Sequence, residues 1–202
     1  EITESFDNWT DGSYGATSVY EEWISNKSLT ETSTSRSGKC VRLRNESNSY
    51  LEYVGEDGNG KDDGVGIISF WYRSWDASPA AIYDVQVSIN GAAYTNIGDQ
   101  ISTSSTTYTQ WSHTINSTEN NIKVKIIYVS GERLLVDDFK ITEFSTSNPE
   151  VTFNTETSTE TETDGTFTIT IPVTVSNYNG NQIDLTVNVT GGTAEVADYT
   201  LN

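Results

Sequence analysis

Short runs of alternating apolar and polar residues recur along most of the chain, and they constrain its fold more than any other feature. The longest is VGIISFWYRSW at residues 65–75, and AIYDVQVSIN at 81–90 and NIKVKIIYV at 121–129 repeat the pattern. Alternation with a period of two places successive side chains on opposite faces of a β-strand. Turn-forming residues separate the runs, among them Asn90-Gly91, a hairpin signal. The pattern predicts an all-β protein.

Composition agrees with this prediction. The sequence has no Met, it is rich in Thr, Ser, Asn and Gly, and it contains too few strong helix formers for one long helix. Roughly nine alternating runs, together with ITESF near the N-terminus, fall within residues 1–145. That number of short strands predicts an antiparallel β-sandwich of the jelly-roll type.

A change in composition at STSNPE, residues 145–150, predicts a domain boundary. Three further alternating runs follow in residues 146–202, separated by the acidic stretch TETSTETETDG. Three strands rarely bury a core by themselves. We therefore expect a jelly-roll sandwich over residues 1–145 and a partial second sandwich over residues 146–202. The second is completed by sequence outside this chain or packs on the first.

The charge of the chain restricts its partners. The formal net charge is −18, of which residues 1–145 contribute −10 and residues 146–202 contribute −8. An acidic surface repels nucleic-acid phosphates and anionic lipid headgroups, and no apolar run is long enough to insert into a membrane. Acidic residues suit Ca²⁺, or they simply keep an extracellular protein soluble. Because the chain begins at Glu1 without a signal peptide, we expect a mature secreted product or an excised fragment.

Residue types needed for catalysis are scarce. His113 is the single histidine and Cys40 the single cysteine, and both lie in alternating runs typical of strands. A Ser-His-Asp triad would need His113 as its base, but no nucleophile-elbow signature accompanies it, and a zinc site normally needs more ligands. Some pairing of carboxylates is inevitable among 29 acidic residues. We expect a protein that is not an enzyme.

Four acidic residues are the candidate metal ligands. In LLVDDFKIT, strict alternation would place Asp137 on the inward face with Phe139 and Ile141, where a carboxylate must be paired, protonated or bound to a cation. The predicted Ca²⁺ ligands are Glu4, Asp7, Asp137 and Asp138. The alternative is that these are strand-end residues in water. EDGNGKDDG at 56–64 resembles a calcium loop, but Lys61 replaces a ligand, so we interpret it as an exposed hairpin loop.

Outward-facing aromatic residues are the candidate ligand-binding site. If Ile68, Phe70 and Tyr72 face the core, then the intervening side chains of the longest run face outward. Aromatic faces stack on sugar C–H surfaces, and planar polar groups bind hydroxyls, a sulfate or a uronate. Alternatively the register is shifted, or a loop covers the aromatic rings. The predicted ligand-binding residues are Trp71, Arg73 and Trp75, with Asp84 and Gln86 beside them.

Two resemblances to known families add to these expectations. The pieces ESFDNW, VSINGAAYTNIG and LLVDDFKIT resemble accessory jelly-roll domains of secreted Bacteroidota proteins, which are similar to carbohydrate-binding modules and MAM domains. Such a resemblance implies a structural Ca²⁺ between the first strand and the final Asp-Asp strand. VTF at 151–153 and GGTAEVADY at 191–199 resemble a Calx-beta domain, whose acidic calcium position is Gly191 here, and the resemblance implies structural roles for Asp198 and Tyr199.

Together these features predict a secreted or cell-surface module that binds a polysaccharide or cell-surface glycan, or mediates adhesion, next to adjoining domains of a larger protein. The alternative is a structural spacer between a catalytic domain and a surface anchor. Exposure of Trp71 and Trp75 side by side would favour the binding module, whereas a covered pair would favour the spacer.

Overall fold

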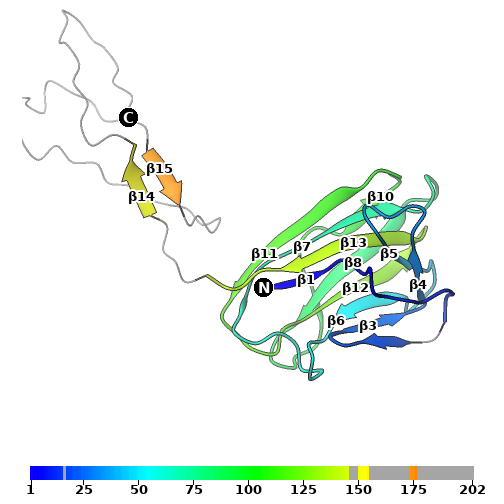
Figure 1. The fold of residues 1–202 in the computed structure, drawn as a ribbon, viewed down its shortest axis with the longest axis horizontal. Coiled ribbons are helices and arrows are strands. Elements are labelled where there is room, and N and C mark those ends of the chain that lie inside the picture. The colour runs from blue at the N-terminus through cyan, green and yellow to red at the C-terminus, as the bar shows by residue number, and fades with distance from the viewer. Residues whose placement is uncertain (16, 146–149, 155–172, 177–202) are drawn as a thin grey trace, which may run out of the picture. The chain divides into compact units, whose positions relative to one another are not determined.

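The computed structural model describes residues 1–15, 17–145, 150–154 and 173–176. Every regular element in these ranges is a β-strand, and the strands of residues 1–145 form two antiparallel sheets (Figure 1). The predicted all-β sandwich is therefore confirmed. The chain divides into two compact units, Glu1–Ser145 and Thr146–Asn202.

Six strands form the first sheet, called sheet A. Five follow the order β11–β7–β13–β5–β4, and the short β1 pairs with β13 beyond the end of β5. The strands of sheet A are β1 (Ile2–Glu4), β4 (Ser28–Glu31), β5 (Cys40–Leu43), β7 (Val65–Ser74), β11 (Thr109–Ser117) and β13 (Leu134–Ile141).

Seven strands form the second sheet, called sheet B. Six follow the order β10–β8–β12–β6–β3–β2, and β9 pairs with β8. The strands of sheet B are β2 (Ser18–Tyr20), β3 (Trp23–Asn26), β6 (Tyr50–Tyr53), β8 (Ala81–Ser88), β9 (Thr95–Asn96), β10 (Ile101–Thr103) and β12 (Lys123–Ser130).

The core lies between the two sheets and is rich in aromatic rings. Phe70 and Phe139 of sheet A stack with their ring centroids 5.4 Å apart, and Trp23 of sheet B meets Phe139 edge-on at 4.9 Å. All three side chains are buried. Such contacts between large rings add to the hydrophobic gain of burying them and hold the two sheets together.

The strands agree with the alternating runs except near the N-terminus and at the short β10, which no run predicted. The run SVYEEWI, which reads as one strand, is a hairpin in which Tyr20 of β2 pairs with Trp23 of β3 across the turn Glu21-Glu22. Glu21 adopts a positive φ of 35°, which an L-residue adopts only at a local cost. Nothing in the residue types signals this turn, because Glu is a poor turn former.

In the second unit the described residues form a two-stranded antiparallel sheet of β14 (Glu150–Phe153) and β15 (Val173–Ser176). The stretch 191–199, on which the Calx-beta resemblance depends, lies outside the described residues, as does most of the remaining sequence of the predicted second sandwich. No helix with the length and apolar character of a membrane span occurs in the described ranges.

Candidate functional site

The aromatic and basic side chains of β7 lie on the outer face of sheet A, away from the core. Ile68 and Phe70 are fully buried, and Trp71 and Arg73, which alternate with them, are partly exposed. Trp71 stands opposite Gln110 of the edge strand β11, and the Gln110 side chain is exposed. The outer face of β7 therefore presents Trp71 and Arg73 toward the solvent side of the sheet.

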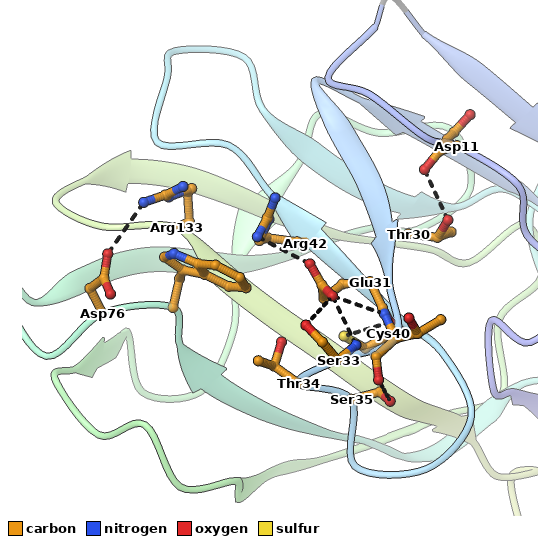
Figure 2. Close-up of polar contacts among 12 residues, drawn as sticks. Asp11, Thr30, Glu31, Ser33, Thr34, Ser35, Cys40, Arg42, Asp76 and Arg133 are labelled. Carbon is orange, nitrogen blue, oxygen red and sulfur yellow. Dashed lines mark hydrogen bonds and ion pairs between the residues drawn. The ribbon is translucent and has the colours of Figure 1, made fainter.

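Arginine side chains stack on both tryptophans. The guanidinium carbon of Arg36 lies 4.2 Å from the Trp71 ring centroid, and those of Arg42 and Arg133 lie 3.9 Å and 5.4 Å from the Trp75 ring centroid. Figure 2 shows Arg42 paired with Glu31 and Arg133 paired with Asp76 around this part of the sheet. Both tryptophans are half-buried, so they are neither fully exposed side by side nor fully covered.

Asp84 and Gln86 do not lie beside the tryptophans, which corrects the predicted grouping. Strand β7 belongs to sheet A and β8 to sheet B, because residues 75–80 carry the chain from one sheet to the other. The outward side chains of the two strands therefore lie on opposite sides of the sandwich. A hairpin would have paired the two strands in one sheet, but this connection crosses to the other sheet.

The outer face of sheet B carries a row of residues that runs across six strands. Each residue of the row stands directly opposite the next one on the neighbouring strand, from β9 at one end to β2 at the other. Residues that stand opposite one another in a sheet share one face. At about 4.8 Å between strands, the row is about 24 Å long. In order, the row consists of Asn96, Gln86, Lys125, Glu52, Ile24 and Val19.

Planar polar groups form a network at the β9 end of this row. Gln86 Nε2 donates to Asn96 Oδ1 at 2.8 Å, and Asn96 Nδ2 donates to Asp84 Oδ2 at 3.0 Å. Gln100 Nε2 donates to the other oxygen of Asp84 at 2.6 Å. These bonds fix the orientation of the amide and carboxylate planes, while Asn96 remains exposed and Asp84 and Gln86 are partly exposed.

Two tyrosines and an ion pair occupy the middle of the face. Lys125 Nζ lies 3.2 Å from Glu52 Oε2, 3.9 Å from the Tyr94 ring centroid and 5.0 Å from the Tyr50 ring centroid. The Tyr94 hydroxyl donates to Glu52. Burial and the Glu52 carboxylate raise the pKa of Tyr94, so its hydroxyl stays protonated. The sequence did not predict that these four residues lie together. Alternation indicates the face on which a residue lies, but it does not show which strands are neighbours in the sheet.

A β-bulge in β13 changes the face on which Asp137 lies. Trp71 pairs with Asp137 and Ser69 pairs with Lys140, so β13 has one residue more than β7 between the two pairs. The extra residue reverses the alternation, and Asp137 shares the outer face of sheet A with Trp71. The prediction that Asp137 shares the inward face of Phe139 is therefore wrong, although Asp137 is fully buried.

Backbone N–H groups surround the buried Asp137 carboxylate. Its Oδ2 accepts from the backbone of Arg36 at 2.8 Å and of Ser37 at 3.4 Å, and its Oδ1 accepts from the backbone of Asp138 at 2.8 Å. Burial raises the pKa of Asp137 to about 6, and the adjacent Asp138 charge acts in the same direction. The loop at residues 32–39 therefore lies over this part of sheet A and encloses the carboxylate.

The other predicted metal ligands have partners of their own. Glu4 accepts from the backbone N–H of Phe6 at 2.5 Å, Asp7 accepts from that of Lys39 at 2.7 Å, and Asp138 pairs with the Arg36 guanidinium. Across the ranges that the structure covers, no three acidic, histidine or cysteine side chains are grouped to hold a metal ion. In the structure, each of these carboxylates accepts bonds from N–H donors.

The loop at 56–64 borders a pocket of about 580 Å³ lined by both acidic and basic groups. Asp57 accepts two bonds from Asn59, and Lys61, which is buried, donates to the Asp62 carbonyl and pairs with Glu143 at 2.9 Å. Lys61 thus anchors the loop to the domain, while Asp57, Asn59 and Asp62 are exposed, as expected of the loop from the sequence.

His113 and Cys40 hold strand positions in sheet A. The His113 ring lies 5.9 Å from that of Trp111 on the same strand. Cys40 is fully buried, and burial raises the pKa of its thiol to about 12. A thiol with this pKa is protonated at neutral pH and is a poor nucleophile.

Comparison with known proteins defines the fold. No protein-family model and no curated protein matches the sequence. The CBM22-1 xylan-binding domain of Paenibacillus barcinonensis Xyn10C is 14% identical, with a TM-score of 0.52 over 72% of this chain and 95% of that one. The K2 cleaved adhesin domain of Lys-gingipain is 16% identical, with a TM-score of 0.50 over 70% and 97% of the two chains. Residues 1–145 therefore have the jelly-roll fold found in carbohydrate-binding modules.

Proposed function

We propose that residues 1–145 form a non-catalytic, extracellular glycan-binding module of a larger secreted protein, and that the glycan binds on the outer face of sheet B. The observation that carries the proposal is the row of residues from Asn96 to Val19, flanked by Tyr50 and Tyr94. It combines aromatic rings with oriented planar polar groups on one exposed face.

The chemistry of this face suits sugar rings. Tyrosine rings provide apolar surfaces for sugar C–H groups, and the hydrogen-bonded Asp84, Gln86 and Asn96 present donors and acceptors for hydroxyl groups. Because these polar groups already bond one another, they lose little side-chain entropy when a ligand binds. The face is therefore organised before the glycan arrives.

The shape of the row favours a polymer over a single sugar. A row about 24 Å long at the usual strand spacing extends over several sugar units in a linear chain. Its far end is apolar, because Val19 is 70% exposed and Ile24 lies beside it in the row. A polysaccharide or a cell-surface glycan lying across the strands would contact the polar end, the tyrosines and the apolar end together.

The fold neighbours support a binding or adhesion role, since one is a xylan-binding domain and another an adhesin domain. The second unit, Thr146–Asn202, fits an adjoining domain in a secreted or cell-surface protein. The net charge of −18 disfavours nucleic acid and anionic membranes as partners.

The test is affinity electrophoresis of the whole chain in gels that contain soluble neutral polysaccharides, including xylan. We expect at least one polysaccharide to retard the protein, and Gln86→Ala and Tyr50→Ala to weaken that retardation about tenfold, the effect of losing about 1.4 kcal/mol. Gln110→Ala is the matched control, because Gln110 is exposed on the outer face of sheet A. Equal retardation of all three variants would place the glycan elsewhere.

A structural spacer is the second candidate function, and one observation favours it. Arginine side chains stack on Trp71 and Trp75, as expected if these rings serve stability and not ligand binding. Absence of retardation by every polysaccharide would leave the spacer as the better account. Calcium binding also stays a prediction, with Glu4, Asp7, Asp137 and Asp138 as its carboxylates.

A further inference from the structure

All five arginines of the chain gather at one region on the outer side of sheet A. They are Arg36, Arg42, Arg44, Arg73 and Arg133, and they are called the arginine cluster below. Such a concentration is unexpected in a chain with a net charge of −18, because scattered bases would neutralise the acidic surface more evenly. The six lysines do not share this region's stacking contacts with tryptophan.

Three aromatic rings hold the cluster together. Besides the contacts to the two tryptophans, the Tyr14 ring lies 5.4 Å from the guanidinium carbon of Arg42 and 5.5 Å from that of Arg44. Arg73 lies on β7 between Trp71 and Trp75 in the sequence. Planar guanidinium groups and flat rings thus alternate over a partly exposed surface, which also suits the binding of a ring that carries an anionic group.

Buried polar atoms without partners point to a ligand at this cluster. The Arg42 Nε and the Tyr14 hydroxyl are buried with no hydrogen-bond partner, and so is the Thr34 hydroxyl of the covering loop. The Tyr14 hydroxyl lies near the Arg133 guanidinium but outside hydrogen-bond geometry. A buried donor that lacks an acceptor is costly, and the oxygen atoms of a bound anion would satisfy it.

Arg36, Arg42 and Arg133 pair with carboxylates of the chain, whereas Arg73 and Arg44 are available to an external anion. Arg73 donates only to the carbonyl oxygens of Ser74 at 3.0 Å and Trp75 at 3.4 Å, and it forms no ion pair within the described ranges. Arg44 pairs with Glu46 at 3.2 Å, with side chains 46% and 44% exposed. Exposed pairs of this kind are weak, so an oxyanion can replace Glu46 at little cost.

We propose that the arginine cluster is a second binding site, which takes an acidic polysaccharide through its uronate carboxylates or sulfate esters. Guanidinium groups bind both oxyanions through paired N–H donors. This site lies on the side of the sandwich opposite the row on sheet B, and it does not depend on neutral-glycan binding there. Figure 2 shows two members of the cluster, Arg42 and Arg133, with their partners Glu31 and Asp76.

The test is affinity electrophoresis of the whole chain in polygalacturonate, dextran sulfate and neutral dextran at low salt. We expect polygalacturonate or dextran sulfate, and not neutral dextran, to retard the protein, and the stronger of the two identifies the oxyanion. Failure of both acidic polymers to retard the chain more than dextran does would overturn the proposal.

Variants locate the binding. We expect Arg73→Gln combined with Arg44→Gln to weaken retardation at least tenfold, and Arg73→Lys to weaken it severalfold because an ammonium group lacks the paired donors. Lys140→Gln is the control, because it removes one positive charge from the same outer face of sheet A, where Lys140 of β13 stands opposite Ser69 of β7. This variant should change retardation less than twofold. An equal loss in Lys140→Gln would mean that general charge, and not the cluster, binds the polymer.

Two further measurements separate a loss of binding from a loss of folding, and this site from the proposed glycan face on sheet B. Melting temperatures confirm that each variant is folded, and Arg44→Gln alone, at a side chain that is 46% exposed, gives a variant with little risk of unfolding. Gln86→Ala should leave acidic-polymer retardation unchanged, which separates this site from the proposed glycan face. Loss of acidic-polymer binding in Gln86→Ala would place both ligands on sheet B and reject the second site.

Discussion

Leu135 and Ile24 hold comparable positions on the two sheets, since each alternates with core residues and points away from the core. Leu135 is nevertheless fully buried, whereas Ile24 is only partly buried. Leu135 stands between Arg42 and Arg73 in the strand pairings. Next to it on the same face, the loop at residues 32–39 donates to Asp137 and receives a bond from the Tyr108 hydroxyl at Thr34. Sheet A thus has an outer layer made by its own chain.

The two outer faces show that strand parity alone does not identify a binding surface. On sheet A, Leu135 and Asp137 are fully buried, and arginines stack on Trp71 and Trp75, so these outward residues contribute to stability. On sheet B, outward residues such as Val19 and Asn96 remain exposed, and their polar neighbours bond to each other. The sheet B face is therefore the better candidate for an extended neutral ligand.

The largest expected effect tests this contrast directly. Leu135→Ala should lower the free energy of unfolding by about 2–5 kcal/mol, as in a core, whereas Ile24→Ala should lower it by about 1 kcal/mol or less. Urea denaturation of both variants measures the difference. Similar small losses would mean that the loop at 32–39 does not seal the outer face of sheet A.

The second prediction concerns the pH dependence of stability at Asp137. Its pKa in the folded protein is about 6, above the usual value of about 3.9 for an unfolded aspartate. The folded state therefore binds the proton more tightly, and this contribution to stability, present below about pH 4, is lost as the pH rises through 6. The loss is about 2–3 kcal/mol at most. Melting temperatures between pH 4 and 7 in EDTA measure it.

Asp137→Asn is the control for this prediction, because an amide does not titrate and should remove most of the pH dependence. The same titration with Ca²⁺ tests the predicted calcium site. A bound cation favours the ionised carboxylate and lowers its pKa, so stability would rise with pH, and chelation would lower the melting temperature. Identical curves in Ca²⁺ and EDTA would reject a calcium site at Asp137.

Much of the fold was predictable because alternation records which residues are buried. Phe70 and Tyr83 follow it, and both are buried. The hairpin at Glu21 and the bulge at Asp138, where φ is 46°, were not predictable, since neither Glu nor Asp marks such positions uniquely. One bulge was enough to move Asp137 to the other face.

The candidate site was harder to predict than the fold because it depends on contacts between distant strands. Gln86, Lys125 and Glu52 come from three separate runs and meet only through the pairings of β8, β12 and β6. Alternation shows that each faces outward but gives no strand order. The arginine cluster has the same origin, since Arg36 and Arg133 lie far apart in the sequence.

A third prediction compares aromatic residues on the two faces. Trp75→Ala should lower stability by about 1–2 kcal/mol through lost contacts with Arg42 and Arg133, with no change in neutral-glycan affinity. Tyr50→Ala should weaken neutral-glycan retardation with a smaller change in stability. Thermal melting measures the stability of each variant, and affinity electrophoresis measures its affinity for the neutral glycan. A Trp75→Ala variant that keeps its stability but loses neutral-glycan binding would assign the glycan to sheet A.

The smallest expected effect is that of salt on neutral-glycan binding. Raising NaCl from about 0.1 M to 1 M shortens the screening length from about 10 Å to 3 Å. The Lys125–Glu52 pair in the middle of the sheet B face has side chains only 16% and 10% exposed, so salt should hardly loosen it. Retardation by a neutral polysaccharide should therefore change less than twofold, while retardation by an acidic polymer should fall at least tenfold. A tenfold salt effect on the neutral polysaccharide would show that exposed charges, and not the tyrosines and amides of sheet B, hold it.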